Sequence, residues 1–274
     1  MASRNINPLM LAGAKINRSS WQANGLVACW EPNVFPGGNT LYDRAGGNDG
    51  TITGADWTTD ASQGHVLDFV ATNSDYVTIT DSAALSITGS FSIMCWCVID
   101  LLDTTKRLIC GKWDDVGGSY RCFALAIMSN DTMAFFISND GTAWDYVSFA
   151  SPATGVLYHC VGVFDGDWIY LYINGKLEAH KDTALVAIFD SNQPVYLGNA
   201  SFGSGIASYF DGTVGEVRIY NRALSAAEIA AIYADPYQIW DVGEEEMEWA
   251  KAAAAAAAGN PHYYYQMLSK RRAS

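Results

Sequence analysis

Hydrophobic and polar residues alternate in short runs between residues 25 and 240, and glycine, asparagine or aspartate separates many of the runs. Alternation with a period of two is typical of a strand that buries one face. Such runs lie at 26–30, 75–79, 90–99, 123–128, 132–138, 145–149, 158–164, 168–173, 194–198 and 215–220. Because no helical period separates them, they predict an all-β fold of antiparallel strands, either a sandwich or a jelly roll.

Two of the predicted turns carry strong hairpin signals. Asn174-Gly175 stands between WIYLYI and KLEAH, and this dipeptide favours a type I′ turn because both positions need positive φ. Asn139-Asp140-Gly141 joins two aromatic-rich runs in a similar way. Both turns therefore predict neighbouring antiparallel strands.

One short helix is predicted near the end of this region, starting near residue 226. Ser225 and Glu228 have the spacing of a capping box, in which each side chain accepts a hydrogen bond from the other residue's backbone. Ile229, Ile232 and Tyr233 share one face of the helix. Because only one face is apolar, the helix is expected to lie on the sandwich and to close it, with a stabilising role.

The segments on either side of residues 25–240 have a different composition. Residues 1–24 lack sustained periodicity, which favours an extended N-terminal arm. Residues 241–274 open with acids, continue with seven alanines and predict a second helix followed by an extended tail. The body of the chain is therefore expected to be a single sandwich domain between two arms.

Residues 241–274 also carry candidate docking side chains. An alanine-rich helix is marginal alone in water, and aromatic side chains are enriched in interfaces, so the segment favours a docking arm. A solvated, frayed tail is the alternative. The candidate docking residues are Trp249, Tyr263, Tyr264, Tyr265, Arg271 and Arg272.

Charge and composition narrow the classes of partner. The 274 residues have a formal net charge of −13, which argues against nucleic acid or an anionic membrane as the partner of the sandwich. No run approaches the roughly 18 apolar residues of a membrane span, and the first residues do not resemble a signal peptide. We therefore expect synthesis in a cytoplasm and no membrane insertion. In that compartment the six cysteines are expected to be buried free thiols.

Three blocks of sequence resemble the laminin G-like domain of the concanavalin A-like lectin and glucanase superfamily. They begin with GLVACWEPN at residue 25, continue with VLYHCVGVFDGDWIYLYINGKL at residue 156 and end with FDGTVGEVRIYNRALSAAEIAAIY at residue 210. The last block is the most specific. The resemblance covers roughly residues 25–235 and implies a jelly-roll sandwich of two antiparallel sheets with the short helix packed against it.

The resemblance leaves activity open, because this fold carries glycosidases, lectins and structural modules. Glycoside hydrolysis needs two suitably spaced carboxylates, and enzymes of the superfamily carry a Glu-x-Asp-x-x-Glu cluster or a similar one, which this sequence lacks. The glutamates between residues 25 and 240 are Glu31, Glu178, Glu216 and Glu228. The sequence therefore predicts a protein that is not an enzyme.

Calcium is the cofactor that the resemblance implies. Laminin G-like domains often hold this ion at a rim of the sandwich through carboxylates and carbonyls, the ligands that a hard cation prefers. Gly215 stands where relatives often have an acid, which removes one ligand. Asx turns explain most of the candidates without a metal. The candidate ligands are Asp43, Asn48, Asp49, Asp75, Asp211 and Glu216.

Aromatic side chains near the Asn139 turn are candidates for a glycan site. A sugar site needs exposed rings beside amide or carboxylate groups, and Trp144 is the best candidate for such a ring. Aromatic residues in strands commonly pack on the sheet instead. The candidate ligand-binding residues are Trp113, Tyr120, Asn139, Asp140, Trp144 and Tyr146.

Two functional hypotheses follow. The first is a structural protein of a virion, a capsid decoration or fibre-associated protein, similar to stand-alone bacteriophage proteins with this domain. Its arms would dock on other virion proteins or on copies of itself, and its sandwich would display a surface for a cell-surface glycan. The alternative is a free lectin-type module that binds carbohydrate, and a glycoside hydrolase is less favoured.

Overall fold

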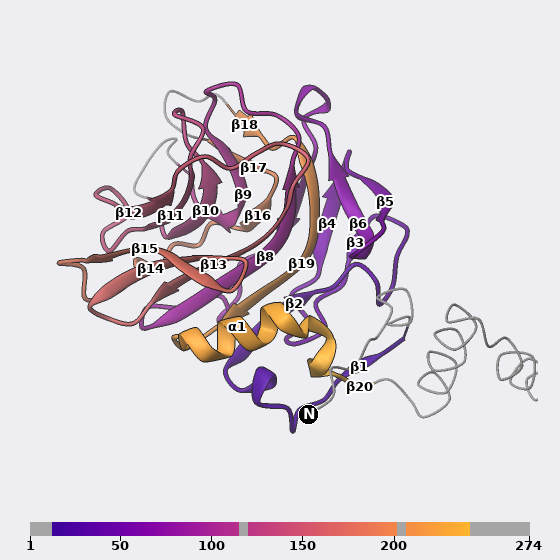
Figure 1. The fold of residues 1–274 in the computed structure, drawn as a ribbon, viewed down its shortest axis with the longest axis horizontal. Helices are drawn as coiled ribbons and strands as arrows, with labels where there is room; N and C mark the ends of the chain where they lie inside the picture. The colour runs from indigo at the N-terminus through magenta and orange to yellow at the C-terminus, as the bar shows by residue number, and fades with distance from the viewer. Residues whose placement is uncertain (1–12, 115–119, 202–206, 242–274) are drawn as a thin grey trace, which may run out of the picture.

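The computed structural model describes residues 13–114, 120–201 and 207–241, and every structural statement below refers to these residues. They form two antiparallel sheets of eight strands that pack face to face, as predicted for a jelly-roll sandwich (Figure 1).

The first sheet, here called sheet I, has the strand order β12-β11-β10-β9-β16-β7-β4-β3. Its strands are β3 (Thr40–Leu41), β4 (Gly50–Thr53), β7 (Tyr76–Ile79), β9 (Arg107–Lys112), β10 (Phe123–Ile127), β11 (Met133–Ile137), β12 (Asp145–Phe149) and β16 (Val195–Leu197). Strands β12 and β3 are therefore the two opposite edges of sheet I.

The second sheet, sheet II, has the order β15-β14-β13-β8-β19-β6-β5, and β2 also pairs with β19. Its strands are β2 (Leu26–Trp30), β5 (Asp56–Asp60), β6 (Gly64–Phe69), β8 (Phe91–Ile99), β13 (Leu157–Phe164), β14 (Trp168–Ile173), β15 (Lys176–Asp182) and β19 (Gly212–Tyr220). Two short ribbons complete the strands: β1 (Lys15–Ile16) with β20 (Trp240–Asp241), and β17 (Asn199–Ser201) with β18 (Ala207–Tyr209).

Alternate residues of each strand fill the space between the sheets. On β8, Cys95 and Cys97 face this inner core, whereas Met94 and Trp96 face the opposite side of sheet II. The predicted alternation on this strand is therefore confirmed. Close packing also explains one glycine: a Cβ atom at Gly162 on β13 would lie 2.2 Å from the ring of Phe135.

The predicted helix is α1 (Ala226–Ala234), and its capping box is present. The Ser225 hydroxyl accepts a hydrogen bond from the Glu228 N–H, and the Glu228 carboxylate accepts one from the Ser225 N–H. Ile229 and Ile232 are fully buried against the outer face of sheet II. Tyr233 is 40% exposed, yet its ring stacks on Trp96 with the ring centres 5.7 Å apart.

The Asn174-Gly175 hairpin is confirmed, with positive φ at both residues between β14 and β15. All six cysteines are buried and free, as expected. Three 3₁₀ turns complete the described elements: Trp21–Ala23, Ala71–Asn73 and η4 (Pro236–Ile239).

The described part of the predicted N-terminal arm is not extended into solvent. Ala14 belongs to the hydrophobic cluster under α1, and β1 pairs with β20. The Gln22 side chain is fully buried and its Oε1 accepts a hydrogen bond from Arg218 at 3.0 Å. Residues 13–24 are therefore part of the folded domain, because apolar contacts and one buried amide attach them to sheet II. Sequence periodicity misses such a segment, since it is neither helical nor alternating.

Candidate functional site

Three aromatic rings lie together at the β12 edge of sheet I, and we call Phe136, Trp144 and Tyr146 the aromatic edge. Phe136 on β11 stands opposite Tyr146 on β12 in the strand register. The ring centres lie 5.4 to 5.6 Å apart. Phe136 is 3% exposed, whereas Trp144 and Tyr146 are each 39% exposed. A buried ring thus supports two rings that present area to solvent.

The turn between β11 and β12 fixes the position of Trp144. Asp140 Oδ1 accepts hydrogen bonds from the N–H groups of Thr142 at 2.8 Å and Ala143 at 2.7 Å. These two bonds lower the pKa of Asp140. Ser138 Oγ accepts a bond from Gly141 N–H at 3.0 Å and donates to the carbonyl of Ala143. A turn with this many internal hydrogen bonds holds the residue that follows it in one place.

The predicted glycan residues divide into those that reach solvent at this edge and one that does not. Asn139 and Asp140 are exposed on the turn beside Trp144. Tyr120 is half-buried and precedes Arg121, whose N–H donates to the carbonyl of Gly141 at 3.3 Å.

Trp113 is only 2% exposed, so its predicted place in an exposed platform is wrong. Its ring packs against that of Phe136, with the ring centres 5.6 Å apart. Trp113 therefore supports the aromatic edge from inside the protein.

Charged side chains border the aromatic edge. Lys106 Nζ lies 5.8 Å from the centre of the Trp144 ring, which is within the range of a cation–π contact. Lys181 on β15 forms an ion pair with Asp145 on β12. The edge therefore combines apolar ring area with polar groups of both signs.

The six predicted calcium ligands do not lie in one site, because they occupy three places. Asp43 lies in the turn after β3, and both of its carboxylate oxygens accept N–H groups: Cys29, Ala45, Gly46 and Asn48 donate from the backbone and Asn48 also from its side chain, all at 2.8 to 3.0 Å. Asp49 accepts from the N–H of Asp43 at 2.8 Å. Donors so arranged stabilise the turn and engage both oxygens of the Asp43 carboxylate, as the alternative of an Asx turn expects.

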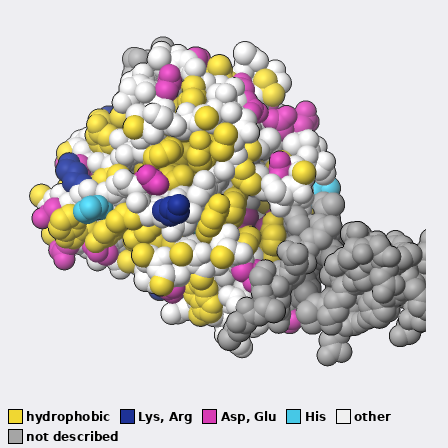
Figure 2. Space-filling model, viewed as in Figure 1, with side chains coloured by type: hydrophobic (Ala, Val, Ile, Leu, Met, Phe, Trp, Pro, Cys, Tyr) yellow, Lys and Arg dark blue, Asp and Glu magenta, His cyan; other side chains and the backbone are white. Residues whose placement is uncertain are grey.

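Asp75 and Asp211 lie near each other at a rim of the sandwich. Asp75 Oδ2 accepts a bond from the Val70 N–H at 2.9 Å, and Asp211 Oδ2 accepts one from the Ala71 N–H at 3.0 Å. Burial raises the pKa of Asp68, and the charges of Asp100, Asp211, Asp56 and Asp75 add to this effect. Figure 2 shows acidic side chains gathered at the upper right, where Figure 1 places β5 and β6.

Glu216 is the third place, and a β-bulge sets its direction. Val214 of β19 pairs with Cys97 and Val217 pairs with Cys95, so Gly215 and Glu216 together oppose Trp96. Such bulges redirect side chains next to functional sites. Glu216 points to the outer side of sheet II, where its Oε2 lies 2.7 Å from Arg218. A buried guanidinium thus pairs with Glu216, the carboxylate that the sequence offered as a calcium ligand.

Beside Glu216 lies a pocket that sequence reasoning missed, here called the Glu31 pocket. It has a volume of about 140 Å³, and its lining includes Glu31, Gln63, Trp96, Glu216 and Tyr237. Trp96 lies on β8 and Glu216 on β19, whereas Glu31 directly follows β2, Gln63 directly precedes β6 and Tyr237 belongs to η4. The spacing of these residues in the sequence forms no motif. The bulge at Gly215 was the one signal in the sequence, because glycine inside a strand often marks a bulge.

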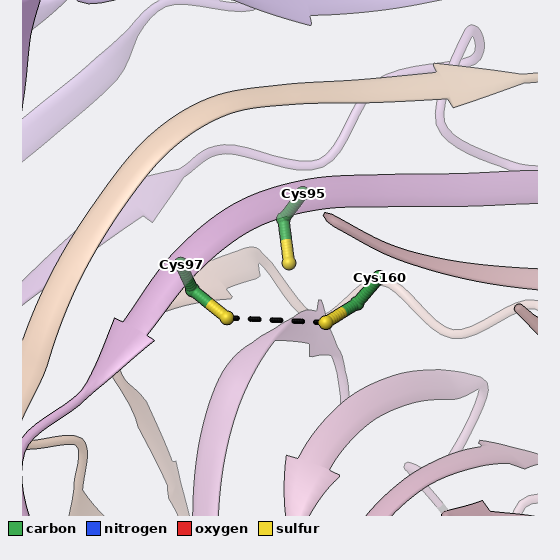
Figure 3. Close-up of side chains that lie close together, drawn as sticks. All are labelled: Cys95, Cys97 and Cys160. Carbon is green, nitrogen blue, oxygen red and sulfur yellow. Dashed lines mark hydrogen bonds between the residues drawn. The ribbon is translucent and has the colours of Figure 1, made fainter. Parts of the chain in front are cut away.

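A cluster of three thiols lies in the inner core. Cys95 and Cys97 on β8 and Cys160 on β13 point toward a common centre (Figure 3), and their sulfur atoms lie within 4.8 Å of one another. The sulfur atoms of Cys97 and Cys160 are 3.9 Å apart. All three thiols are fully buried, and burial raises the pKa of Cys160 well above its usual value. Metals bind thiolates, so these thiols are best explained as small core side chains.

The predicted docking residues Trp249, Tyr263, Tyr264, Tyr265, Arg271 and Arg272 lie outside the described residues. No helix in the described part of the chain is long and apolar enough to cross a bilayer.

Comparison with known proteins places the fold. A sequence profile described as the concanavalin A-like lectin/glucanases superfamily matches residues 71–230. Among solved structures, the binding domain of Paraclostridial Mosquitocidal Protein 1 superposes with a TM-score of 0.61 at 12% identity, covering 76% of this chain and 52% of that one. No curated protein matches the sequence.

Two further structures have the same fold. The Trypanosoma rangeli sialidase in complex with sialic acid superposes with a TM-score of 0.60 at 17% identity, over 78% of this chain and 33% of that one. The binding domain of botulinum neurotoxin serotype G gives 0.58 at 14% identity, over 76% and 50%. The chain thus spans about half the length of the toxin domains and a third of the sialidase, and these identities establish likeness of fold alone.

Proposed function

The chain belongs to the concanavalin A-like lectin/glucanases superfamily, and we propose that it is a carbohydrate-binding protein whose ligand stacks on the aromatic edge. The observation that carries the proposal is the pair of exposed rings of Trp144 and Tyr146, which the buried ring of Phe136 supports. A sugar ring presents C–H groups to an aromatic face and hydroxyl groups to polar neighbours. Asn139, Asp140 and the charged groups at this edge would supply those neighbours.

Replacing Trp144 by alanine is expected to weaken glycan binding by about 1 to 2 kcal/mol, or roughly five- to thirtyfold, because exposed aromatic anchors contribute this much in binding sites. A glycan array would first identify the ligand, and calorimetry would then measure the affinity of each variant.

The matched control for Trp144→Ala is Tyr42→Ala. Tyr42 is 42% exposed and follows β3, which is the opposite edge of sheet I from β12. Equal affinity of the Trp144→Ala and Tyr42→Ala variants would place the sugar elsewhere.

We propose that binding is not followed by hydrolysis. The Glu31 pocket brings two glutamates together, but Glu216 is held by Arg218 at one oxygen and by the Cys29 thiol, 3.5 Å away, at the other. A carboxylate so engaged is a poor nucleophile or base. Hydrolysis of a bound glycan that is lost in Glu31→Gln would overturn this part of the proposal.

Calcium at the rim is a second part of the proposal, supported by the acids around Asp68 and Asp211. If the ion binds there, calcium raises both the free energy of unfolding and the midpoint of thermal unfolding. At a calcium concentration one hundred times the dissociation constant, the free energy of unfolding rises by about 2.7 kcal/mol. Asp211→Asn is expected to abolish the rise of the thermal midpoint that calcium causes. Asp43→Asn is expected to be less stable without calcium but to show the same calcium-induced rise as the unchanged protein. A shift that persists in Asp211→Asn, or no shift at all, would contradict a calcium site at this rim.

The composition of residues 241–274 supports an additional assembly role, in which this segment docks the sandwich on a virion or on copies of itself. Removing residues 242–274 is expected to convert a defined oligomer into a monomer, measured by light scattering. Replacing Trp249 and Tyr263 to Tyr265 by serine in the full chain tests the same contact without truncation. The same number of chains per particle in all three proteins would contradict the assembly role and leave the proposal of carbohydrate binding unaffected.

A further inference from the structure

The Glu31 pocket contains polar atoms that have no partner. Gln63 is 6% exposed, and neither its Oε1 nor its Nε2 has a hydrogen-bond partner among the described residues. An unpaired buried amide costs free energy, so it usually marks a ligand or an ordered water. Gly215 makes room for this amide, because a Cβ atom there would lie 2.2 Å from Gln63 Oε1.

Glu31 offers a second open acceptor in the same pocket. It is 4% exposed, and its Oε1 accepts two bonds from Asn33, from the backbone N–H at 2.9 Å and the side chain at 2.8 Å. Its Oε2 accepts no hydrogen bond within the described part of the chain. Asn33 thus holds Oε1 of the carboxylate, and Oε2 can accept a hydrogen bond from a ligand.

The charges around the pocket leave one acid in excess. Arg218 lies behind Glu216, held by that carboxylate, by Gln22 and by the carbonyl of Pro236 at 2.6 Å. This pairing holds the charge of Glu216 and leaves Glu31, whenever its carboxyl is ionised, without a counter-ion of its own. Rings of Trp96 and Tyr237 line the pocket, and aromatic faces attract cations.

We propose that the Glu31 pocket binds a protonated primary amine that carries a neighbouring hydroxyl group, as in an amino sugar or a small amino alcohol. A primary ammonium has three donors and no acceptor, which suits Glu31 Oε2 and Gln63 Oε1. Gln63 Nε2 would donate to the hydroxyl. The carbon skeleton would lie against Trp96 and Tyr237, and about 140 Å³ holds one such ring.

Binding would exchange the ammonium for a proton. Burial and the charge of Glu216 raise the pKa of Glu31 to about 8, so its carboxyl is protonated at neutral pH. The other titratable or charged groups that face it are Glu216 and Arg218 on β19, Cys29 on β2 and Tyr237 on η4, and Asp60 at the end of β5 faces Tyr237. Below pH 8 the affinity for a protonated amine should fall about tenfold per pH unit, because one proton must leave.

The test is an NMR titration of the full chain with glucosamine and ethanolamine, with glucose as the neutral counterpart, followed at the indole N–H of Trp96. We expect both amines to bind at pH 7.0 and to bind about tenfold more weakly at pH 6.0. At pH 7.0 the affinity for each amine should exceed the affinity for glucose at least tenfold. Binding of glucosamine alone would assign the pocket to amino sugars, and binding of both amines to the amino alcohol group itself. Equal binding of glucose, or no shift with either amine, would overturn the proposal.

Glu31→Gln keeps the Asn33 contacts and removes the charge, so it should weaken amine binding at least tenfold and remove its dependence on pH. Glu178→Gln is the matched control on β15, where the side chain is exposed. Gln63→Met tests the second acceptor if Glu31→Gln does not fold. Trp144→Ala should leave amine binding unchanged, which separates this pocket from the aromatic edge. Unchanged affinity in Glu31→Gln, or in Gln63→Met where that variant replaces it, would overturn the proposal.

Discussion

Replacing Arg218 by methionine is expected to lower the free energy of unfolding by about 3 to 5 kcal/mol, because it leaves a buried carboxylate without its counter-ion. Arg218 is fully buried and Glu216 is 4% exposed. The guanidinium also donates to Gln22 and to the carbonyl of Pro236, so one substitution removes one bond to residues 13–24 and one bond to η4 as well. Urea unfolding followed by tryptophan fluorescence measures the loss.

The companion variant for Arg218→Met is Glu216→Gln with Arg218→Met. Removing both charges is expected to restore most of the stability, since a buried pair contributes little over an apolar replacement. Lys181→Met breaks the exposed pair with Asp145 and should cost less than about 1 kcal/mol. A loss of under 1 kcal/mol in Arg218→Met would mean that the Glu216 carboxylate takes a proton or water instead.

Replacing Asp43 by alanine is expected to cost about 3 kcal/mol or more, because four backbone N–H groups and the Asn48 amide lose a charged acceptor. Asp43→Asn should be nearly as costly, because the NH₂ group of the new amide would face N–H groups that now donate to the Asp43 carboxylate. Thermal unfolding with and without calcium is the measurement. For each variant, we expect the loss of unfolding free energy relative to the unchanged protein to be the same with calcium as without it.

The control for Asp43 is Asp49→Ala in the same turn. Asp49 is exposed and accepts one backbone bond, so its loss should cost about 1 kcal/mol or less. If calcium stabilised the unchanged protein but not Asp43→Ala, Asp43 would be a metal ligand and the interpretation of its five bonds would be wrong.

The sequence predicted those features that depend on neighbouring residues. The Ser225 capping box, the Asn174-Gly175 hairpin and the alternation of Cys95, Trp96 and Cys97 each follow from local backbone geometry, and the structure confirms them. Strand β9 was missed because Arg107, Gly111 and Lys112 interrupt its apolar run. Lys112 is buried all the same, with ion pairs to Asp81 and Asp190.

The candidate sites were predictable to different degrees. Trp144, Tyr146 and Asn139 lie in or beside one hairpin turn. The turn signal in the sequence therefore predicted that they are neighbours, and the structure confirms this. The Glu31 pocket depends on the bulge at Gly215 and on a register between strands far apart in sequence. No local pattern encodes such a register, and for the same reason the calcium candidates could not be sorted into their three places.

The small ribbon of β1 and β20 also has a mechanical consequence. Lys15 lies opposite Asp241 and Ile16 opposite Trp240, so both strands continue from the same end of the ribbon. A force that pulls Lys15 away from Asp241 would unzip these pairs one after another instead of shearing them together. We expect the ribbon, which includes the fully buried Trp240, to separate before the force breaks strand pairs in either large sheet.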